Sequence, residues 1–529
     1  MALSRKIVST VFLMALLAGS TVFARSGYYD VGDFGAEGDG EKLCTESIQA
    51  AVDKCAAADG GTVHVGPGKW LTGTIYLESN VELLLDAGCM LLGSRDPEHY
   101  ARMHTPAGGG ESYRKWAIIA GTGLENVSVR GVGTIDGQGD AFRWKDRARP
   151  KNIIFENCRN VLVENINMLN AGSWMQHYIK CEGVSIRGIK VFNHVSYNND
   201  GLNIDSCRGV RISDCVVDSD DDAIVLKSCS LTPCEDITIT NCVVSSHCNS
   251  IKMGTESGGG FRNITVSNCA VSSPRKSKVI YGRQRGLAGI ALEIVDGGTM
   301  ERVTVSNITI KGVTVPIFVR LGNRGRVYEK DKPAPGVGIL RDVVISNIIA
   351  SDTSNIGCSI TGLPGHPVRN ITLSNISLGF EGGGAAGDAT IKVPEKQDSY
   401  PESTMFGMLP AYGFYCRHVE GLKFDNVRLW TNQEDRRAAI VCEDVADLNI
   451  DKLDAQFGAG SLLRFVDVRD ALISGSRPKG GLLLRLQGDK TDRVLLSGND
   501  LSGVGKVAEL ADDVSKKALI EQGNYRPAD

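Results

Sequence analysis

The chain has 529 residues, with 62 glycines, 16 prolines and a formal net charge of −4 at pH 7. A charge this close to neutral gives no basic face of the kind that nucleic-acid-binding proteins need. After the first 24 residues no stretch is long and apolar enough to cross a bilayer, so we expect neither a nucleic-acid nor a membrane partner.

The amino-terminal residues have the features of a secretory signal peptide. A basic pair, Arg5-Lys6, precedes an apolar run over residues 7–17, and Val22-Phe23-Ala24 offers a plausible cleavage site. The apolar run is too short for a membrane span. We therefore expect residues 1–24 to be removed, and residues 25–529 to form one exported domain, periplasmic or extracellular and monomeric.

Residues 25–95 are expected to form a cap and the first coils of the fold. The stretch from Thr45 to Ala58 has an amphipathic helical pattern. Its apolar face would consist of Ile48, Ala51, Val52 and Cys55. Such a helix would cover the open end of a repeat structure, whose terminal repeats need a protected edge.

A short pattern then recurs along the chain: aliphatic, any residue, aliphatic, any residue, and then usually Asn, Asp or Gly. Apolar alternation with turn formers predicts short strands with one buried face, and a fixed period of about two dozen residues predicts a solenoid. Because parallel crossovers are right-handed, the expected fold is all-β, a right-handed parallel β-helix. The copies end at Gly131, Asn165, Gly188, Asp214, Asn241, Asn268, Asn307, Asn347, Asn375, Asn426, Lys452, Gly475 and Gly498.

The position after the turn residue is usually apolar, and it accounts for several of the 15 cysteines. Cys215, Cys242 and Cys269 occupy this position and are predicted to be small buried hydrophobic residues. Cys229 and Cys234 could instead close a small disulfide loop. In the first nine copies this position holds Val132, Ile166, Ile189, Cys215, Cys242, Cys269, Ile308, Ile348 and Ile376.

Three carboxylates and an imidazole share one stretch of the repeat. Asp221 and Asp222 follow Asp200 by 21 and 22 residues, and His247 follows Asp222 by 25. Neighbouring parallel strands lie ~4.8 Å apart, so a coil of this length would stack these side chains in one patch. Asp221 and Asp222 would point to opposite faces of an ideal strand, so both can serve one site only at a bend.

This stretch resembles glycoside hydrolase family 28, the polygalacturonases and rhamnogalacturonan hydrolases of the pectate-lyase-type β-helix superfamily. The similarity rests on Asn199-Asp200-Gly201, then Asp221-Asp222 with Lys227, then His247, in that order. It implies that Asp221 is the general acid, that Asp200 and Asp222 hold the attacking water, and that His247 tunes the acid or binds the +1 sugar. It also implies an inverting hydrolase of galacturonic-acid-containing pectic poly- or oligosaccharides, working without a metal or cofactor.

The chain departs from the family where polygalacturonases carry an Arg-Ile-Lys triplet for the substrate carboxylate. The corresponding positions hold Ala291 and Glu293, and Asp220 stands where a glycine often precedes the paired aspartates. We expect other cations to bind the carboxylate, since arginine pairs with both of its oxygens, and Glu293 to bind a sugar hydroxyl. The candidate substrate-binding residues are Asn199, Lys227, Lys252, Arg283, Arg285, Glu293 and Arg320.

The segment over residues 380–414 is too long for a simple turn and is expected to be functional. It could wall off one end of the groove, which would favour exo action on chain ends. Residues 430–529 are expected to form the last coils and the carboxy-terminal cap. Trp174, Gln176 and His177 are further candidates for lining the cleft.

Two alternatives remain open at this stage. A calcium-dependent pectate-type lyase would use the acidic triplet as oxygen ligands for Ca²⁺. A non-catalytic β-helix would only bind polysaccharide.

Overall fold

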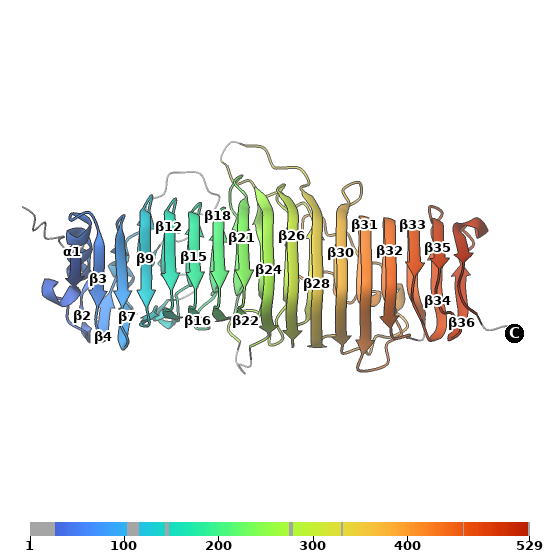
Figure 1. The fold of residues 1–529 in the computed structure, drawn as a ribbon, viewed down its shortest axis with the longest axis horizontal. Coiled ribbons are helices and arrows are strands. Elements are labelled where there is room, and N and C mark those ends of the chain that lie inside the picture. Colours follow the sequence, from blue (N-terminus) through green and yellow to red (C-terminus); the bar gives the residue numbers. More distant parts are fainter. Residues whose placement is uncertain are drawn as a thin grey trace, which may run out of the picture.

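In the computed structural model the chain winds into an elongated parallel β-helix with its coils stacked along the longest axis (Figure 1). The structure describes residues 27–102, 116–142, 148–274, 279–329, 332–458 and 460–526. The predicted signal peptide lies outside these ranges. Within them, no helix has the length and apolar character that a membrane span requires.

Each coil contributes strands to three parallel sheets. The first sheet contains the strands that end at the recurring turn residue. Its separate strands are β1 (Gly27–Asp30), β3 (Gly61–Val65), β6 (Val81–Leu85), β9 (Glu125–Gly131), β12 (Arg159–Glu164), β15 (Glu182–Arg187), β18 (Arg208–Ser213), β21 (Cys234–Thr240), β35 (Asp492–Ser497) and β37 (Leu519–Gln522).

The second and third sheets follow the first in each coil. Strands of the second sheet are β2 (Asp39–Leu43), β4 (Gly68–Thr72), β7 (Cys89–Gly93), β10 (Thr134–Asp136), β13 (Asn167–Leu169), β16 (Lys190–Asn193), β19 (Val216–Ser219) and β22 (Val243–Ser246). Those of the third are β5 (Ile75–Tyr76), β8 (Ala117–Thr122), β11 (Lys151–Glu156), β14 (Gln176–Ile179), β17 (Leu202–Asp205), β20 (Ile224–Ser228), β23 (Asn249–Ser257), β25 (Ala288–Ile294), β27 (Val315–Leu321), β29 (Cys358–Thr361), β34 (Gly480–Gln487) and β36 (Val504–Leu510).

In the second half of the molecule long strands bend from one sheet into the next. They are β24 (Gly260–Ser272), β26 (Thr299–Lys311), β28 (Ile339–Thr353), β30 (Val368–Phe380), β31 (Ala411–Thr431), β32 (Ala438–Ala455) and β33 (Ser461–Ser474). Short 3-10 helices cover Val31–Phe34, Pro97–His99, Gly139–Ala141, Asp388–Thr390 and Lys516–Ala518.

The one α-helix, among the described residues, is α1 (Thr45–Ala56), and it lies at the amino-terminal end of the solenoid (Figure 1). Its buried residues are the four that the amphipathic pattern predicts. The helix packs on β1 and β3 and so covers the first coil.

The recurring turn residues adopt the left-handed conformation that allows the chain to leave the first sheet. Their φ values lie between 52° and 66°, except at Gly131, where φ is 129°. Asparagine tolerates this conformation. The side-chain amides of Asn307, Asn347, Asn375 and Asn426 each donate a hydrogen bond to the asparagine one coil earlier, at 2.8–3.0 Å. These stacked amides therefore form a structural ladder.

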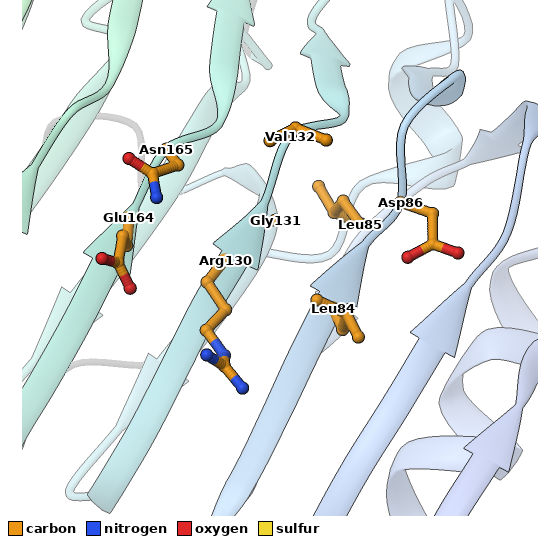
Figure 2. A pocket seen from close by; sticks show the side chains of 8 residues that line it. All are labelled: Leu84, Leu85, Asp86, Arg130, Gly131, Val132, Glu164 and Asn165. Atoms are coloured by element: carbon orange, nitrogen blue, oxygen red, sulfur yellow. The ribbon is translucent and has the colours of Figure 1, made fainter.

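The apolar position after the turn is buried in every copy except the first. Val132 is 57% exposed and lies at the turn beside a surface hollow of about 210 Å³ (Figure 2). Both Val132 N–H and Gly133 N–H donate to the Leu85 carbonyl. Thr134 and Ile135 pair in register with Asn167 and Met168, so this turn has one extra residue, and the buried Gly133 takes the position of Ile166. The prediction for Val132 was therefore wrong.

All fifteen cysteines lie in the described residues, and none of them forms a disulfide. Cys215, Cys242 and Cys269 are buried in the apolar core, as predicted. The possible disulfide between Cys229 and Cys234 is contradicted, and Cys234 is another buried core residue.

Candidate active site

The predicted site residues lie at the corner where the second sheet turns into the third. Asp200 precedes β17, the Asp221–Asp222 pair precedes β20, and His247 precedes β23, so they belong to successive coils. Gly201 N–H donates to the Asp222 carbonyl at 2.9 Å, and Ala223 N–H donates to the Asn249 carbonyl at 2.9 Å. This register stacks Asp200, Asp222 and Asn249 in one row.

A cavity of about 350 Å³ opens over this row. It contains all three predicted acids, Asp200, Asp221 and Asp222, and two of the other predicted residues, Lys227 and Trp174. Its lining, among the described residues, is Arg149, Lys151, Ser173, Trp174, Asn198, Asp200, Asp221, Asp222, Lys227, Cys248, Glu256, Tyr281, Arg326, Tyr400 and Glu402.

A bend in the main chain brings the two adjacent aspartates to the same cavity. The hydroxyls of Ser219 and Ser246 each donate a hydrogen bond to the Asp221 carbonyl at 2.7 Å. Asp222 N–H donates to Asp221 Oδ1 at 2.9 Å. These contacts hold the turn that an ideal strand would not make.

Two buried lysines face the acids. Lys227 Nζ lies 3.6 Å from Asp200 Oδ2 and 3.3 Å from Glu256 Oε2. Lys252 Nζ lies 3.2 Å from Asp222 Oδ2. The other oxygen of this carboxylate, Oδ1, accepts a hydrogen bond from the Asn249 amide at 2.8 Å. Asp200 and Asp222 are therefore each held by an ammonium group.

Two carboxyls of the cluster, those of Asp221 and Asp200, have raised pKa values. Burial and the nearby charge of Asp222 raise the pKa of Asp221 to about 6, although the two lysines oppose the shift. Burial and Asp221 also raise the pKa of Asp200, against the effect of Lys227. Asp221 is the acid of the three that is partly exposed to solvent. The cluster can therefore offer a proton at slightly acidic pH.

His247 lies in a neighbouring row, not among the lining residues. Its backbone N–H donates to the Ser219 carbonyl, which places it beside Asp220 and not beside Asp221. His247 Nδ1 donates to the Arg283 carbonyl at 2.8 Å, and Nε2 is 3.7 Å from Asp220 Oδ1. The ring is fully buried, and this burial lowers its pKa. Direct contact with a sugar, one of its two expected roles, does not fit this position.

Three buried groups next to the cavity have the composition of a metal site. The ligand atoms of His194, Asp220 and His247 lie within 4.8 Å of one another. Both nitrogens of His194 face carboxylates, however, with Nδ1 2.5 Å from Asp220 Oδ1 and Nε2 3.0 Å from Asp218 Oδ1. Burial lowers the pKa of His194, but the two aspartates raise it above its ordinary value. Both ring nitrogens of His194 are thus already engaged by carboxylates, so we assign no metal to this cluster.

The other predicted substrate-binding residues are not among those that line the cavity. Arg320 is fully buried and donates to the Thr361 hydroxyl and to the carbonyls of Gly362, Glu395 and Lys396 at 2.8–3.2 Å. The prediction that Arg320 binds substrate is therefore corrected, because this arginine anchors the long segment after β30.

Arg283 and Arg285 also lie outside the cavity lining. Arg283 is exposed, and Arg285 forms ion pairs with Asp352 at 3.8 Å and Glu381 at 3.6 Å. Their predicted contact with substrate has no support in this arrangement. Alternation along a sequence shows which face a residue takes, but not whether a cavity opens there.

Asn199, Lys252 and Glu293 are buried and lie outside the lining set. Lys252 and Glu293 contact each other, with Nζ 3.8 Å from Oε2. Lys252 reaches the cavity indirectly, through Asp222. Asn199 and Glu293 are therefore buried polar groups outside the cavity lining, and their contact with a sugar stays a prediction. Gln176 and His177, the strand residues after Trp174, are likewise buried.

Sequence reasoning missed most of the cations and aromatic rings of the cavity. Lys151 lies in register with Trp174 and Asp200, in an earlier coil, so the repeat register could have identified it. Arg326 and Tyr400 come from inserted loops, for which the repeat gives no register. Arg326 Nη1 donates to Glu256 Oε1 at 2.8 Å.

The long segment after β30 folds back over the third sheet. Asn323 N–H donates to the Gln397 carbonyl at 2.7 Å, and the Ser403 hydroxyl donates to the Leu287 carbonyl at 2.7 Å. Tyr400 and Glu402, which lie between these two attachments, form part of the cavity wall.

The fold and the site together define a parallel β-helix protein with a carboxyl cluster in a cation-rich cavity. Glycosyl hydrolases family 28 matches residues 100–399, which is more than half of the chain. The chain belongs to this family.

Individual relatives extend this comparison. A probable polygalacturonase from Vitis vinifera is 34% identical over 238 residues, covering 41% of this chain and 47% of that protein. The chain thus spans about half the length of this curated relative.

Solved structures share the fold at lower identity. The exopolygalacturonase from Thermotoga maritima superposes with a TM-score of 0.58 at 24% identity, covering 67% of this chain and 87% of that chain. A surface protein and adhesin from Streptococcus pneumoniae reaches a TM-score of 0.51 at 15% identity, covering 83% of this chain and all of that chain. The β-helix therefore does not by itself decide between hydrolysis and adhesion.

Proposed function

We propose that this chain is an inverting glycoside hydrolase that acts on galacturonic-acid-containing pectic poly- or oligosaccharides. The observation that carries the proposal is the cluster of Asp200, Asp221 and Asp222 in one cavity, with the pKa of Asp221 raised to about 6. Inverting hydrolysis needs one protonated carboxyl and one carboxylate that activates water.

The three aspartates take different roles in this proposal. Asp221 donates its proton to the glycosidic oxygen as the bond from that oxygen to the anomeric carbon breaks. A water held by Asp200 and Asp222 attacks the anomeric carbon from the opposite face, and its proton passes to one of these carboxylates. Lys227 and Lys252 hold the two water-binding acids in place.

The charge of the cavity wall supports an acidic substrate. Four cations, Arg149, Lys151, Lys227 and Arg326, line it. Guanidinium groups pair well with carboxylates, and the family relative from Vitis vinifera is named as a probable polygalacturonase. These cations take the place of the triplet that is absent at Ala291 and Glu293.

The size of the cavity favours action on chain ends. Its volume of about 350 Å³ is at the lower end for ligand pockets, and Tyr400 and Glu402 from the long segment form one wall. A bounded cavity suits the end of a sugar chain better than its middle. We therefore propose exo action.

The calcium-dependent lyase is less well supported. Two ammonium groups lie 3.6 Å from Asp200 and 3.2 Å from Asp222, and they would repel a divalent cation at these oxygens. The non-catalytic alternative remains a matter for experiment, because an adhesin shares the fold.

The decisive experiment is to incubate the protein with oligogalacturonides, polygalacturonan and rhamnogalacturonan and to follow the products by NMR. We expect new reducing ends of inverted anomeric configuration, released as small units, and no effect of a chelator. Asp221→Asn should lower the rate by at least about 100-fold, as expected for loss of a general acid. Unsaturated products or loss of activity with chelator would favour the lyase. Binding without any new reducing ends, in wild type and variant alike, would favour the adhesin-like protein.

We also propose that the protein is exported, on the strength of the signal-peptide pattern in residues 1–24. Amino-terminal sequencing of the protein from the periplasm and the medium tests this. A mature chain that still begins at Met1 would contradict it.

A further inference from the structure

A lysine on the neighbouring strand lies beside the position where the family's first substrate-binding cation is absent. Lys252 on β23 pairs in register with Ala291 on β25. Two residues along β25, Glu293 occupies the position of the second missing cation. At the place of the missing carboxylate-binding triplet, a lysine from the neighbouring coil thus lies beside a glutamate.

Lys252 connects the catalytic cluster to this altered position. Its side chain is 1% exposed. Its Nζ lies 3.2 Å from Asp222 Oδ2 and 3.8 Å from Glu293 Oε2. Asn249 holds Oδ1 of Asp222, so that Lys252 and Asn249 together fix both oxygens of this carboxylate.

Glu293 is a buried carboxyl group with few partners. It is fully buried, and neither of its oxygens has a hydrogen-bond partner among the described residues. Burial raises the pKa of Glu293 to about 8, Lys252 opposes this shift, and Glu402 adds to it. Below this pH Glu293 is uncharged, so it does not compete with Asp222 for the ammonium group.

We propose that Lys252 is a positioning residue that orients Asp222 toward the attacking water, and that Glu293 controls it by staying neutral and drawing the ammonium away when it ionises. This inference rests on the proposed hydrolytic function, with Asp222 as a water-holding acid. An ionised Glu293 would turn a contact of 3.8 Å into a direct ion pair, at the cost of the contact with Asp222.

The surroundings of Glu293 support this competition. The charged groups that act on it come from four parts of the chain: Lys252 from β23, Asp222 from the corner before β20, Glu402 from the long segment, and Arg324 after β27. Arg324 is already paired with Asp296 at 2.5 Å, and Glu402 and Asp222 repel a charge on Glu293. Lys252 is therefore the cation that would move.

The first test separates orientation from substrate binding. Lys252→Met should lower kcat by about 10- to 100-fold with KM changed less than about threefold, since Asp222 loses its orientation but the cavity wall is intact. Lys252→Arg should recover part of kcat. A raised KM with unchanged kcat would make Lys252 a substrate-binding residue and overturn the proposal, as would an unchanged kcat and KM in a folded variant.

The second test concerns the pH profile. The ratio of kcat in Glu293→Gln to kcat in wild type should be within about twofold of one near pH 6 and should rise by at least about threefold above pH 8, because the competing charge is removed; loss of the Asp221 proton lowers both rates alike and cancels in this ratio. Glu443→Gln is the matched control, since Glu443 is a partly buried glutamate paired with Arg464 at 3.1 Å and lies outside the cavity lining. A ratio of the two kcat values that stays constant from pH 6 to above pH 8 would contradict the role of Glu293.

A third measurement does not depend on activity. Infrared difference spectra should show a protonated carboxyl C=O band that disappears above about pH 8 and is absent from Glu293→Gln. If wild type cleaves none of the tested sugars, the proposed function fails, but this band still decides whether Glu293 is neutral. If wild type is active and the band is missing, only the inference on Glu293 fails.

Discussion

At the scale of single residues, the carboxyl cluster consists of ionisable groups that are largely buried from water. Asp200 and Asp222 are almost fully buried, Asp221 is partly buried, and two lysines lie among them. Spacing along the sequence was sufficient to bring these three acids together. It could not place His247, because the coil that follows Asp222 reaches the same row after 27 residues, at Asn249, and not after the 25 residues that separate Asp222 from His247.

Asp221 should destabilise the fold at neutral pH. A carboxyl whose pKa is raised on folding binds its proton more tightly in the native state, so stability falls as pH rises from about 4 through about 6. Asp221→Asn should therefore be more stable than wild type by about 1–3 kcal/mol at pH 8, with little gain at pH 4. Denaturant unfolding at the two pH values measures this.

The control for this prediction is Asp492→Asn at an exposed position, which should show no pH-dependent gain. An equal gain at pH 4 and pH 8 in Asp221→Asn would mean that packing, and not ionisation, is responsible.

At the scale of elements, the segment between β30 and β31 contributes to the cavity wall from more than 150 residues beyond the acids. The length of this segment predicted that it is functional and that it could form a wall at one end of the groove. Its docking surface was not predictable, because Arg320 binds main-chain carbonyls, which every residue type supplies. The same fact explains why Arg320 resembled a substrate-binding cation in the sequence.

Arg320→Met should loosen this segment. The guanidinium donates to the carbonyls of Glu395 and Lys396, and hydrogen bonds from a charged donor are worth about 1.5–3 kcal/mol each. Local opening should become at least about tenfold more frequent, which limited proteolysis within residues 381–410 would detect. Arg485→Met, at an exposed ion pair with Glu509, should leave the cleavage rate unchanged. Equal rates in wild type and Arg320→Met would show that other contacts hold the segment.

At the scale of the whole molecule, the repeat predicted most of the fold, because every coil has to make the same kind of turn. The chain must leave the first sheet with positive φ at thirteen similar positions. Asparagine meets this need at many of them, and its amide also bonds to the coil before. The first copy failed at Val132, where a longer turn replaces the usual one.

Asn347→Ala should destabilise the fold by about 1–3 kcal/mol. It removes two side-chain hydrogen bonds, with Asn307 and Asn375, and places alanine at a φ of 54°. Asn347→Gly keeps the backbone conformation accessible and should lose less. Thermal unfolding compares the two variants. Equal losses of stability in the two variants would assign the whole effect to the hydrogen bonds. No loss in either variant would show that the asparagine ladder does not contribute to stability.

The separation between the acids and the segment at residues 381–410 has a consequence for how such a protein can diverge. The acids and their lysines are encoded within residues 200–252, whereas Tyr400 and Glu402 belong to an insertion that leaves the coils in register. Changes in the insertion can thus alter how substrate enters the cavity without changing the acids and lysines. Exchanging this insertion between relatives should change the length of the released sugar while the configuration at its new anomeric centre stays the same.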